Sequence, residues 1–364
     1  MNTTAALYGG MRRRRYLTTA AAVGAGLLAG CTDLVETRQL RSAPAVLAER
    51  PAAVYYPTHV DGMAMVGATD AGPYRVALMY SYPHRFWTVT GAESQQTEIS
   101  AEDDVHLMAV VWDRETETLL PESGLSVAIE RDGTPISEEV IYPMLSQPMG
   151  FHYGANFGLD GEGSYSVSVR VGGVSTRRTG AYRGRFESPA TGTIPFEYSA
   201  TARDELPYTE TMDRAGERAA RRPMGMGMLP SSALPAPAAL PGVNHGTTTI
   251  GDARLLIQSL SPPPAGLAGG PSYLAISART PYNAFVLPAM ALEGRLTRAG
   301  EPVYVGDLSR TLDPALDYHY GAVVPSVEPG DRLEIGVRVP SQVARHEGYE
   351  TAFLSTETAT VTLA

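Results

Sequence analysis

The sequence contains no lysine: all 29 of its basic residues are arginine, and with 39 acidic residues the formal net charge is −10. This acidic balance disfavours nucleic acids and anionic lipid headgroups as partners, because both repel negative charge. The single cysteine, Cys31, excludes an internal disulfide bond. Familiar catalytic patterns are also absent, among them Gly-x-Ser-x-Gly, the phosphate-binding Gly-x-x-x-x-Gly-Lys loop and Cys-x-x-Cys. These absences predict that the chain is not an enzyme.

The N-terminal segment has the arrangement of an export signal. Residues 12–15 are four arginines, followed by small and apolar residues as far as Gly30, which is typical of a twin-arginine signal and too short for a membrane span. The run ends in Leu-Ala-Gly-Cys31, the pattern at which a lipoprotein is cut and its new N-terminal cysteine acylated. We predict a signal peptide over 1–30, a lipid anchor on Cys31 and a flexible tether over 31–53. The protein would then lie on the extracellular face of the cytoplasmic membrane.

Residues 54–200 consist of short runs rich in Val, Tyr, Ile and Ser, separated by Gly, Asp and Pro. This spacing is typical of a β-sandwich. Asp132-Gly133 lies between two such runs and predicts a tight hairpin turn. We expect strands over residues 74–82, 105–112, 125–131, 164–171 and 193–199.

The chain contains the same module twice. The hexapeptide Phe151-His152-Tyr153-Gly154-Ala155-Asn156 returns as Tyr318-His319-Tyr320-Gly321-Ala322-Val323. Residues 201–249 are rich in proline and methionine and predict an inter-domain linker. A second set of strand patterns fills residues 250–364. We therefore predict an all-β fold of two tandem β-sandwiches.

The two copies can be aligned beyond the hexapeptide. Residues 273–285 align with 74–86, and residues 331–339 align with 163–171. The segment from Asn283 to His319 in the second module is shorter than the segment from His84 to His152 in the first. The alignment therefore predicts that the second module lacks the turn and acidic stretch before His106.

Imidazole and thioether groups gather around the first hexapeptide. Alternate residues of a strand share a face, so His106 and Met108 point the same way. A sandwich brings the segment of His152 beside such a strand, and Met144 or Met149 can complete a set of metal ligands. Two interpretations stay open, because a single methionine in a sandwich more often fills the core, and His152 also suits a structural hydrogen bond.

Three stretches of the first module form a series: Asp104-Val105-His106-Leu107-Met108-Ala109, Tyr142-Pro143-Met144-Leu145 and His152-Tyr153-Gly154-Ala155-Asn156. This series resembles the periplasmic iron/copper-binding proteins that serve high-affinity iron uptake. The resemblance covers about residues 54–200 and implies an immunoglobulin-like or cupredoxin-like sandwich. It also implies His106, Met144 and His152 as metal ligands.

Two positions depart from the pattern of that family. Its carboxylate ligand falls on Met108, and its last histidine falls on Phe186. Exchanging a carboxylate for a thioether softens the site and favours Cu(I) over Fe(II). The missing imidazole leaves a vacancy for which the sequence offers these candidates: His84, His59, Met63 and Met65.

Other nitrogen and sulfur donors receive weaker assignments. The run Met224-Gly225-Met226-Gly227-Met228 spaces thioethers in a way that suits capture of a soft ion, but a low-complexity linker is the favoured explanation. In the second module Met290, His319 and His346 are interpreted as structural. His319 also supports a structural explanation of His152, because the second copy keeps the motif without methionine partners.

These patterns support three functions. The first is a membrane-anchored carrier that binds iron or copper, as Fe(II) or Cu(I), and hands the ion to a permease. The second is a cell-surface pair of sandwiches in which the His-Tyr-Gly-Ala motif only holds strands together. The third is a metal-dependent redox enzyme. Members of the resembling family form homodimers, so we expect the second module to serve as an internal partner in a monomeric chain, with a homodimer as the alternative.

Overall fold

The structure, a computed structural model, describes residues 44–225 and 227–364. The predicted signal peptide, the predicted anchor Cys31 and the first part of the predicted tether lie outside the described residues. Among the residues that are described, no helix is long and apolar enough to cross a membrane.

In residues 44–225 and 227–364, strands make up nearly all of the regular structure, together with one short α-helix and two 3₁₀ turns. The strands of the first module are β1 (His59–Asp61), β2 (Ala64–Ala71), β3 (Tyr74–Ser81), β4 (Phe86–Thr90), β5 (Glu93–Thr97), β6 (Val105–Asp113), β7 (Leu125–Arg131), β8 (Thr134–Ser146), β9 (Gly150–Phe157), β10 (Gly163–Val171), β11 (Arg177–Arg178) and β12 (Ala190–Tyr198). The 3₁₀ turn η1 (Gly180–Tyr182) lies between β11 and β12. The helix α1 (Ala200–Asp204), β13 (Tyr208–Glu210) and the turn η2 (Pro237–Ala239) lead to the second module. That module contains β14 (Val243–Ile250), β15 (Ala253–Leu260), β16 (Ser272–Arg279), β17 (Ala291–Arg298), β18 (Glu301–Asp313), β19 (Asp317–Val324), β20 (Arg332–Val339), β21 (Ala344–Arg345) and β22 (Thr358–Thr362).

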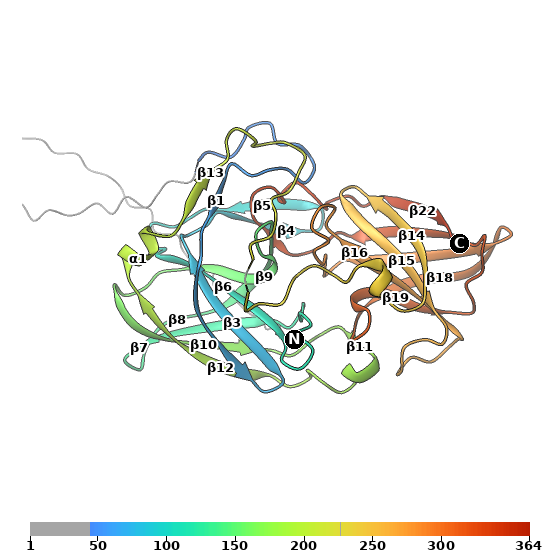
Figure 1. Ribbon diagram of the computed structural model, residues 1–364, viewed down its shortest axis with the longest axis horizontal. Coiled ribbons are helices and arrows are strands. Elements are labelled where there is room, and N and C mark those ends of the chain that lie inside the picture. Colours follow the sequence, from blue (N-terminus) through green and yellow to red (C-terminus); the bar gives the residue numbers. More distant parts are fainter. Residues whose placement is uncertain (1–43, 226) are drawn as a thin grey trace, which may run out of the picture. The chain divides into compact units, whose positions relative to one another are not determined.

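Each module is a sheet that curves until its two edge strands meet (Figure 1). The first sheet has the order β12-β10-β7-β8-β9-β6-β3-β2, and β12 contacts β2. The second has the order β14-β15-β16-β19-β18-β17-β20-β22, and β14 contacts β22. The expected all-β fold of two tandem sandwiches is confirmed.

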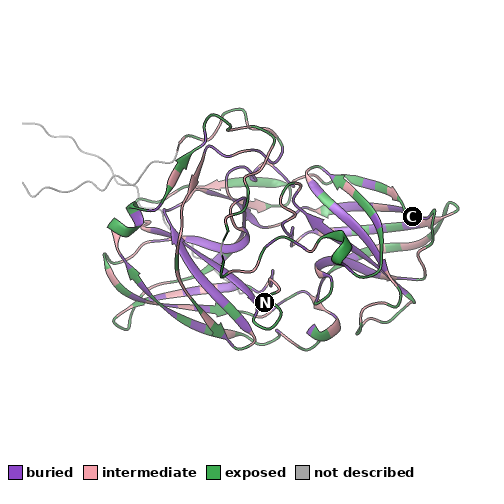
Figure 2. Ribbon diagram, viewed as in Figure 1, coloured by how far each residue is buried: buried purple, intermediate pink, exposed green. Residues whose placement is uncertain are grey.

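Side-chain alternation explains which strands face solvent. In β10, Tyr165, Val167 and Val169 are buried while the residues between them are more exposed, the pattern of a strand with one face on the core. β6 differs, because all nine of its residues are buried. One face of β6 joins the main core and the other packs in a small separate cluster. Figure 2 shows such inner strands as continuous purple ribbons.

Two short-range predictions are confirmed. Asp132 and Gly133 connect β7 to β8, and both have positive φ angles, 51° and 77°, as a two-residue hairpin turn requires. The alignment of 331–339 with 163–171 also agrees with the structure, since β20 and β10 take the same place in the two strand orders.

The alignment of residues 273–285 with 74–86 is wrong. β6 pairs with the strand of His152, and its counterpart β16 pairs with the strand of His319. The counterpart of β3 is therefore β15, and the extra piece of the first module is the β4–β5 hairpin. A strand equivalent to that of His106 is present in the second module. Tyr273 takes the register position of His106, because Tyr273 lies opposite Val323 as His106 lies opposite Asn156.

Each module contributes one short strand that pairs with a strand of the other module. β11 of the first module runs parallel to β18, and β21 of the second runs parallel to β8. Ala344 lies opposite Met144, and the backbone N–H of His346 donates to the carbonyl of Leu145 at 3.1 Å. One continuous cluster of buried apolar side chains includes both modules. The exchange carries His346 to the strand of Met144.

Candidate metal centre

Three histidines from distant parts of the chain meet at one point. His106 lies on β6, His152 on β9, and His346 directly after β21. One ring nitrogen of each lies within 4.8 Å of the others. The predicted convergence of His106 and His152 is therefore present, and the third member comes from the second module.

The ring nitrogens that face this point have no hydrogen-bond partner. Nε2 of His106, Nε2 of His152 and Nε2 of His346 are all inaccessible to solvent and unpaired. A buried polar atom without a partner costs free energy, so such atoms are rare in folded proteins. Three of them converging on one point have the arrangement of metal ligands.

Hydrogen bonds at the opposite nitrogens fix the tautomers. Nδ1–H of His152 donates to the carbonyl of Gly150 at 3.0 Å. Nδ1–H of His106 donates to Oδ1 of Asn156 at 2.8 Å. The amide of Asn156 is itself oriented by the backbone of His84, which donates to Oδ1 and accepts from Nδ2. Nε2 of His106 and Nε2 of His152 therefore each carry a free lone pair, as in most histidines that bind metals.

The surroundings keep these rings neutral. Burial lowers the pKa of His152 to about 4, with a smaller effect from the charge of His84. Burial likewise lowers the pKa of His106 and that of His346 well below the usual value, and the neighbouring histidines lower both further. Neutral imidazole is the form that coordinates a metal ion, so the three rings are ready to bind near neutral pH.

A thioether lies beside the imidazoles. Met144 is fully buried on β8, directly opposite His152. A Cβ atom placed on Gly154 would lie 3.1 Å from Sδ of Met144 and 2.7 Å from Nε2 of His106. The absence of a side chain at Gly154 therefore keeps space at the centre, and Met144 supplies a fourth donor atom.

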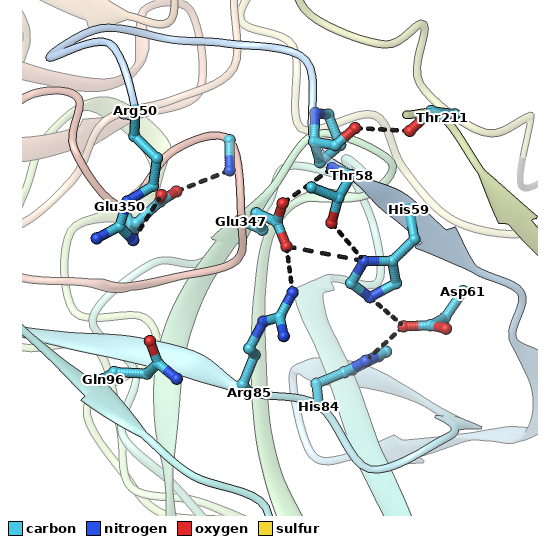
Figure 3. A network of polar contacts seen from close by, with 12 residues as sticks. Arg50, Thr58, His59, Asp61, His84, Arg85, Gln96, Thr211, Glu347 and Glu350 are labelled. Atoms are coloured by element: carbon cyan, nitrogen blue, oxygen red, sulfur yellow. Dashed lines mark hydrogen bonds and ion pairs between the residues drawn. The ribbon is translucent and has the colours of Figure 1, made fainter. Parts of the chain in front are cut away.

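A polar network that includes His84, Asp61, His59 and Glu347 lies next to the centre, and Figure 3 shows this network. The ring of His84 lies 4.6 Å from that of His106 and 5.2 Å from that of His346, and Nδ1 of His84 lies 2.9 Å from Oδ2 of Asp61. Burial by itself raises the pKa of Asp61. The charge of His84 and the hydrogen bonds from His59 and His84 together lower it by more than burial raises it, so the pKa of Asp61 lies below its usual value. Asp61 is thus an anion that orients His84 toward the triad.

His59 belongs to this outer network and not to the triad. Its ring lies 3.6 Å from Asp61, 3.7 Å from Glu347 and stacks on Tyr208. Glu347 also pairs with Arg85 at 2.8 Å. The sequence offers His84, His59, Met63 and Met65 for the missing imidazole; in the structure it is His346 that lies with His106 and His152, and the ring of His84 is adjacent to it.

The other predicted methionines do not join Met144: they lie in or against a separate apolar cluster, or at the surface. Met108 is buried in the small cluster on the outer face of β6, and Met63 and Met149 pack against that cluster. Met149 also lines a cavity of about 160 Å³ together with Met224 of the linker. Met65 is 37% exposed.

Sequence reasoning missed His346, which it assigned to the structure of the second module. The position of the family's last histidine, Phe186, is buried in the core against Tyr74 and Tyr182. No local pattern marks His346 as a ligand. Only the pairing of β21 with β8 brings it to the centre.

The equivalent position in the second module is closed. Nδ1–H of His319 donates to the carbonyl of Asp317 at 2.9 Å, as in the first copy, but Nε2 accepts from the hydroxyl of Tyr273 at 3.0 Å. The guanidinium of Arg177, which arrives on β11, donates to Tyr273 and Thr311. A built-in cation and a hydroxyl therefore fill the space that the first module leaves to three free nitrogens.

Comparisons with known proteins give a limited set of matches. A model of a domain of unknown function, DUF7350, matches residues 238–362. No curated protein matches the chain. Among solved structures, FetP of uropathogenic Escherichia coli strain F11, as isolated, is similar at 24% identity and a TM-score of 0.32, over 37% of this chain and 95% of that chain. A copper-bound variant of the same protein is similar at 22% identity and a TM-score of 0.31, over 38% of this chain and 92% of that chain.

Proposed function

We propose that this protein binds a transition-metal ion, copper or iron, at the centre formed by His106, His152, His346 and Met144. The convergence of three buried and unpaired Nε2 atoms carries the proposal. Free energy lost by burying these atoms without partners is recovered when an ion accepts their lone pairs.

The donor set favours Cu(I). Three imidazoles and one thioether are neutral, and the carboxylate that would suit a harder ion is replaced by Met108 in the outer cluster. Burying a monovalent ion among neutral donors costs less desolvation energy than burying a divalent one. Fe(II) remains the second candidate, because imidazole suits it as well.

Comparison with the second module argues against a purely structural role for the first hexapeptide. Both modules keep the same backbone pairing and the same Nδ1 hydrogen bond to the residue two positions earlier. In the second module Tyr273 completes the hydrogen bonding of His319. A structural histidine at position 152 would be expected to have such a partner on Nε2, and it has none.

The wider role proposed for the chain is that of a carrier. Coordination and exchange of the ion would be its mechanism, without bond making, so the protein would not be an enzyme. Cys31 would anchor it on the outer face of the cytoplasmic membrane, and a permease there would receive the ion. Weak neutral thioether donors suit a site that must release its ion.

Metal analysis of the purified protein tests the centre. The full chain with Cys31→Ser is prepared without chelators, which removes a thiolate that would itself bind Cu(I). We expect about one equivalent of copper or iron, and a loss of at least tenfold in affinity for His152→Gln and for His346→Gln, as expected for removal of a ligand worth ~1.4 kcal/mol or more.

His319→Gln is the matched control, because it changes the same motif where the ring nitrogens are already bonded. This variant should keep the metal content of the parent protein. Parent protein without metal, or equal metal content in all three variants, would support the structural alternative instead.

A further inference from the structure

A row of methionines crosses the first sheet and ends at the metal centre. Met65 on β2 lies opposite Met79 on β3, and Met79 lies opposite Met108 on β6. Opposite residues of antiparallel strands project from the same face, with Cβ atoms about 5 Å apart. The three thioethers therefore follow one another across the sheet.

At its inner end the row lies next to Gly154, which borders the centre. Met108 lies opposite Gly154 on β9. Because Gly154 has no side chain, nothing from that residue separates the thioether of Met108 from the donor atoms of His106 and Met144 beside it. His106 also precedes Met108 by two residues and shares its face of the strand.

Exposure increases along the row toward β2. Met108 and Met79 are 2% and 1% exposed, whereas Met65 is 37% exposed. Met63 and Met149 pack against the cluster that contains Met79 and Met108, and the remaining members are apolar: Ala77, Val110, Trp112, Leu119 and Leu229.

The second module provides an internal comparison. The same register there holds Asn244, Gln258 and Ala275, followed by Gly321. The sheet can thus be built at these positions without methionine. Thioethers occur in the module whose imidazoles are free, and they are absent from the row in the module whose centre is closed by Tyr273.

We propose that Met65, Met79 and Met108 form a relay that carries Cu(I) between the surface at β2 and the imidazole centre. This inference rests on the proposed metal-binding function and adds the ion and its route. Thioethers are soft donors that accept Cu(I) and discriminate against harder hydrated divalent ions. An ion that moves between neighbouring sulfurs stays coordinated, and so avoids the large cost of entering the apolar interior bare.

The relay is tested by removing two sulfurs from its buried part. The double variant Met79→Leu and Met108→Leu, in the full chain with Cys31→Ser, keeps the side-chain volume nearly unchanged. Anaerobic stopped-flow mixing with Cu(I) held by a weak chelator measures loading, and mixing the loaded protein with a strong Cu(I) chelator measures release. Both rates should fall by about tenfold or more, while the equilibrium affinity changes by less than about threefold because the centre is intact.

Two further variants keep the test decisive. Met290→Leu, which changes a buried methionine of the second module, should load and release at the parent rates. Met65→Ser alters an exposed position where folding is not at risk, and it should slow Cu(I) loading. Co(II), a harder ion that probes the imidazoles, should load equally in all variants.

The possible failures can be told apart. Parent-like Cu(I) rates in both the double variant and Met65→Ser would overturn the relay while the imidazole centre stands. A parent protein that binds neither Cu(I) nor Co(II) would overturn the proposed function, and the relay with it.

Discussion

At the scale of single residues, the two copies of the repeated motif differ in the hydrogen bonding of one ring nitrogen, Nε2 of the histidine. His152 and His319 have the same backbone setting, and each donates from Nδ1 to the carbonyl two residues earlier. The two copies differ at the equivalent position of the adjacent strand. That position is His106 in the first module, and in the second it is Tyr273, whose hydroxyl bonds to Nε2 of His319. In the second module the Tyr273 hydroxyl bonds to Nε2 of His319 and is itself held by Arg177, whereas Nε2 of His152 has no such partner.

His319 should give folding stability a pH dependence that can be isolated. Burial lowers its pKa to about 4; the bond to the Asp317 carbonyl and the charge of Asp313 oppose this effect, and the charge of Arg177 adds to it. An unfolded histidine binds a proton near pH 6.5. Between pH 6.5 and 4 the unfolded state therefore binds more protons than the folded state, and stability falls as the pH falls.

The measurement is urea unfolding of the parent protein and of His319→Gln at pH 7 and pH 4.5. The parent should lose about 2 kcal/mol more than the variant over this interval. Asp313, Asp317 and Arg177 are unchanged in both proteins, so their own titration largely cancels in the difference. Equal losses would mean that His319 is protonated in the folded state.

At the scale of elements, the short strand β21 has more influence on the centre than its two residues suggest. Arg345 on β21 is fully buried, and its guanidinium donates to the carbonyls of Ser341, Ala352 and Phe353. These bonds hold the loop on either side of His346. Burial lowers the pKa of Arg345 to about 9, which leaves the side chain charged near neutral pH.

Arg345→Met should therefore weaken both the fold and the centre. The three carbonyls lose their donor, and each unsatisfied buried group costs about 1–3 kcal/mol. We expect a loss of at least ~2 kcal/mol of stability in urea unfolding, together with weaker Cu(I) binding because His346 is the next residue.

Arg338→Met is the control for this change. Arg338 is a half-exposed arginine on β20 whose ion pairs with Asp307 and Glu293 lie at the surface. Such pairs contribute about 1 kcal/mol or less. A stability loss for Arg345→Met no larger than that for Arg338→Met would show that β21 does not depend on these carbonyl bonds.

At the scale of the whole molecule, the reciprocal pairing of β11 with β18 and of β21 with β8 has the form of a two-fold dimer contained in one chain. One half keeps an open centre, and the other closes it with Arg177 and Tyr273. The two halves thus differ at their centres, while each still supplies a short strand to the sheet of the other.

We expect the chain to be monomeric, because the surfaces that two copies would use are already occupied within one copy. Sedimentation equilibrium of the full chain with Cys31→Ser should give the mass of a single chain over a wide concentration range. A tight dimer would count against the internal partnership.

Much of the fold follows from local sequence. Alternating apolar residues predict β7 and β10, Asp132-Gly133 predicts the hairpin between β7 and β8, and the repeated hexapeptide predicts two modules. His106, Met144 and His152 were identifiable as candidates because they lie in three short stretches with a recognisable spacing. Periodicity and motif are properties of neighbouring residues, so they can be read without coordinates.

The composition of the centre was decided by tertiary structure. His346 reaches it only because β21 of one module adds to β8 of the other, and Met79 enters the methionine row only through the register of β3 against β6. The same pairing shows that Tyr273 takes the place of His106 in the second module. Which strands become neighbours depends on the packing of the entire core, and residues far apart in sequence carry no local mark of the contacts that packing gives them.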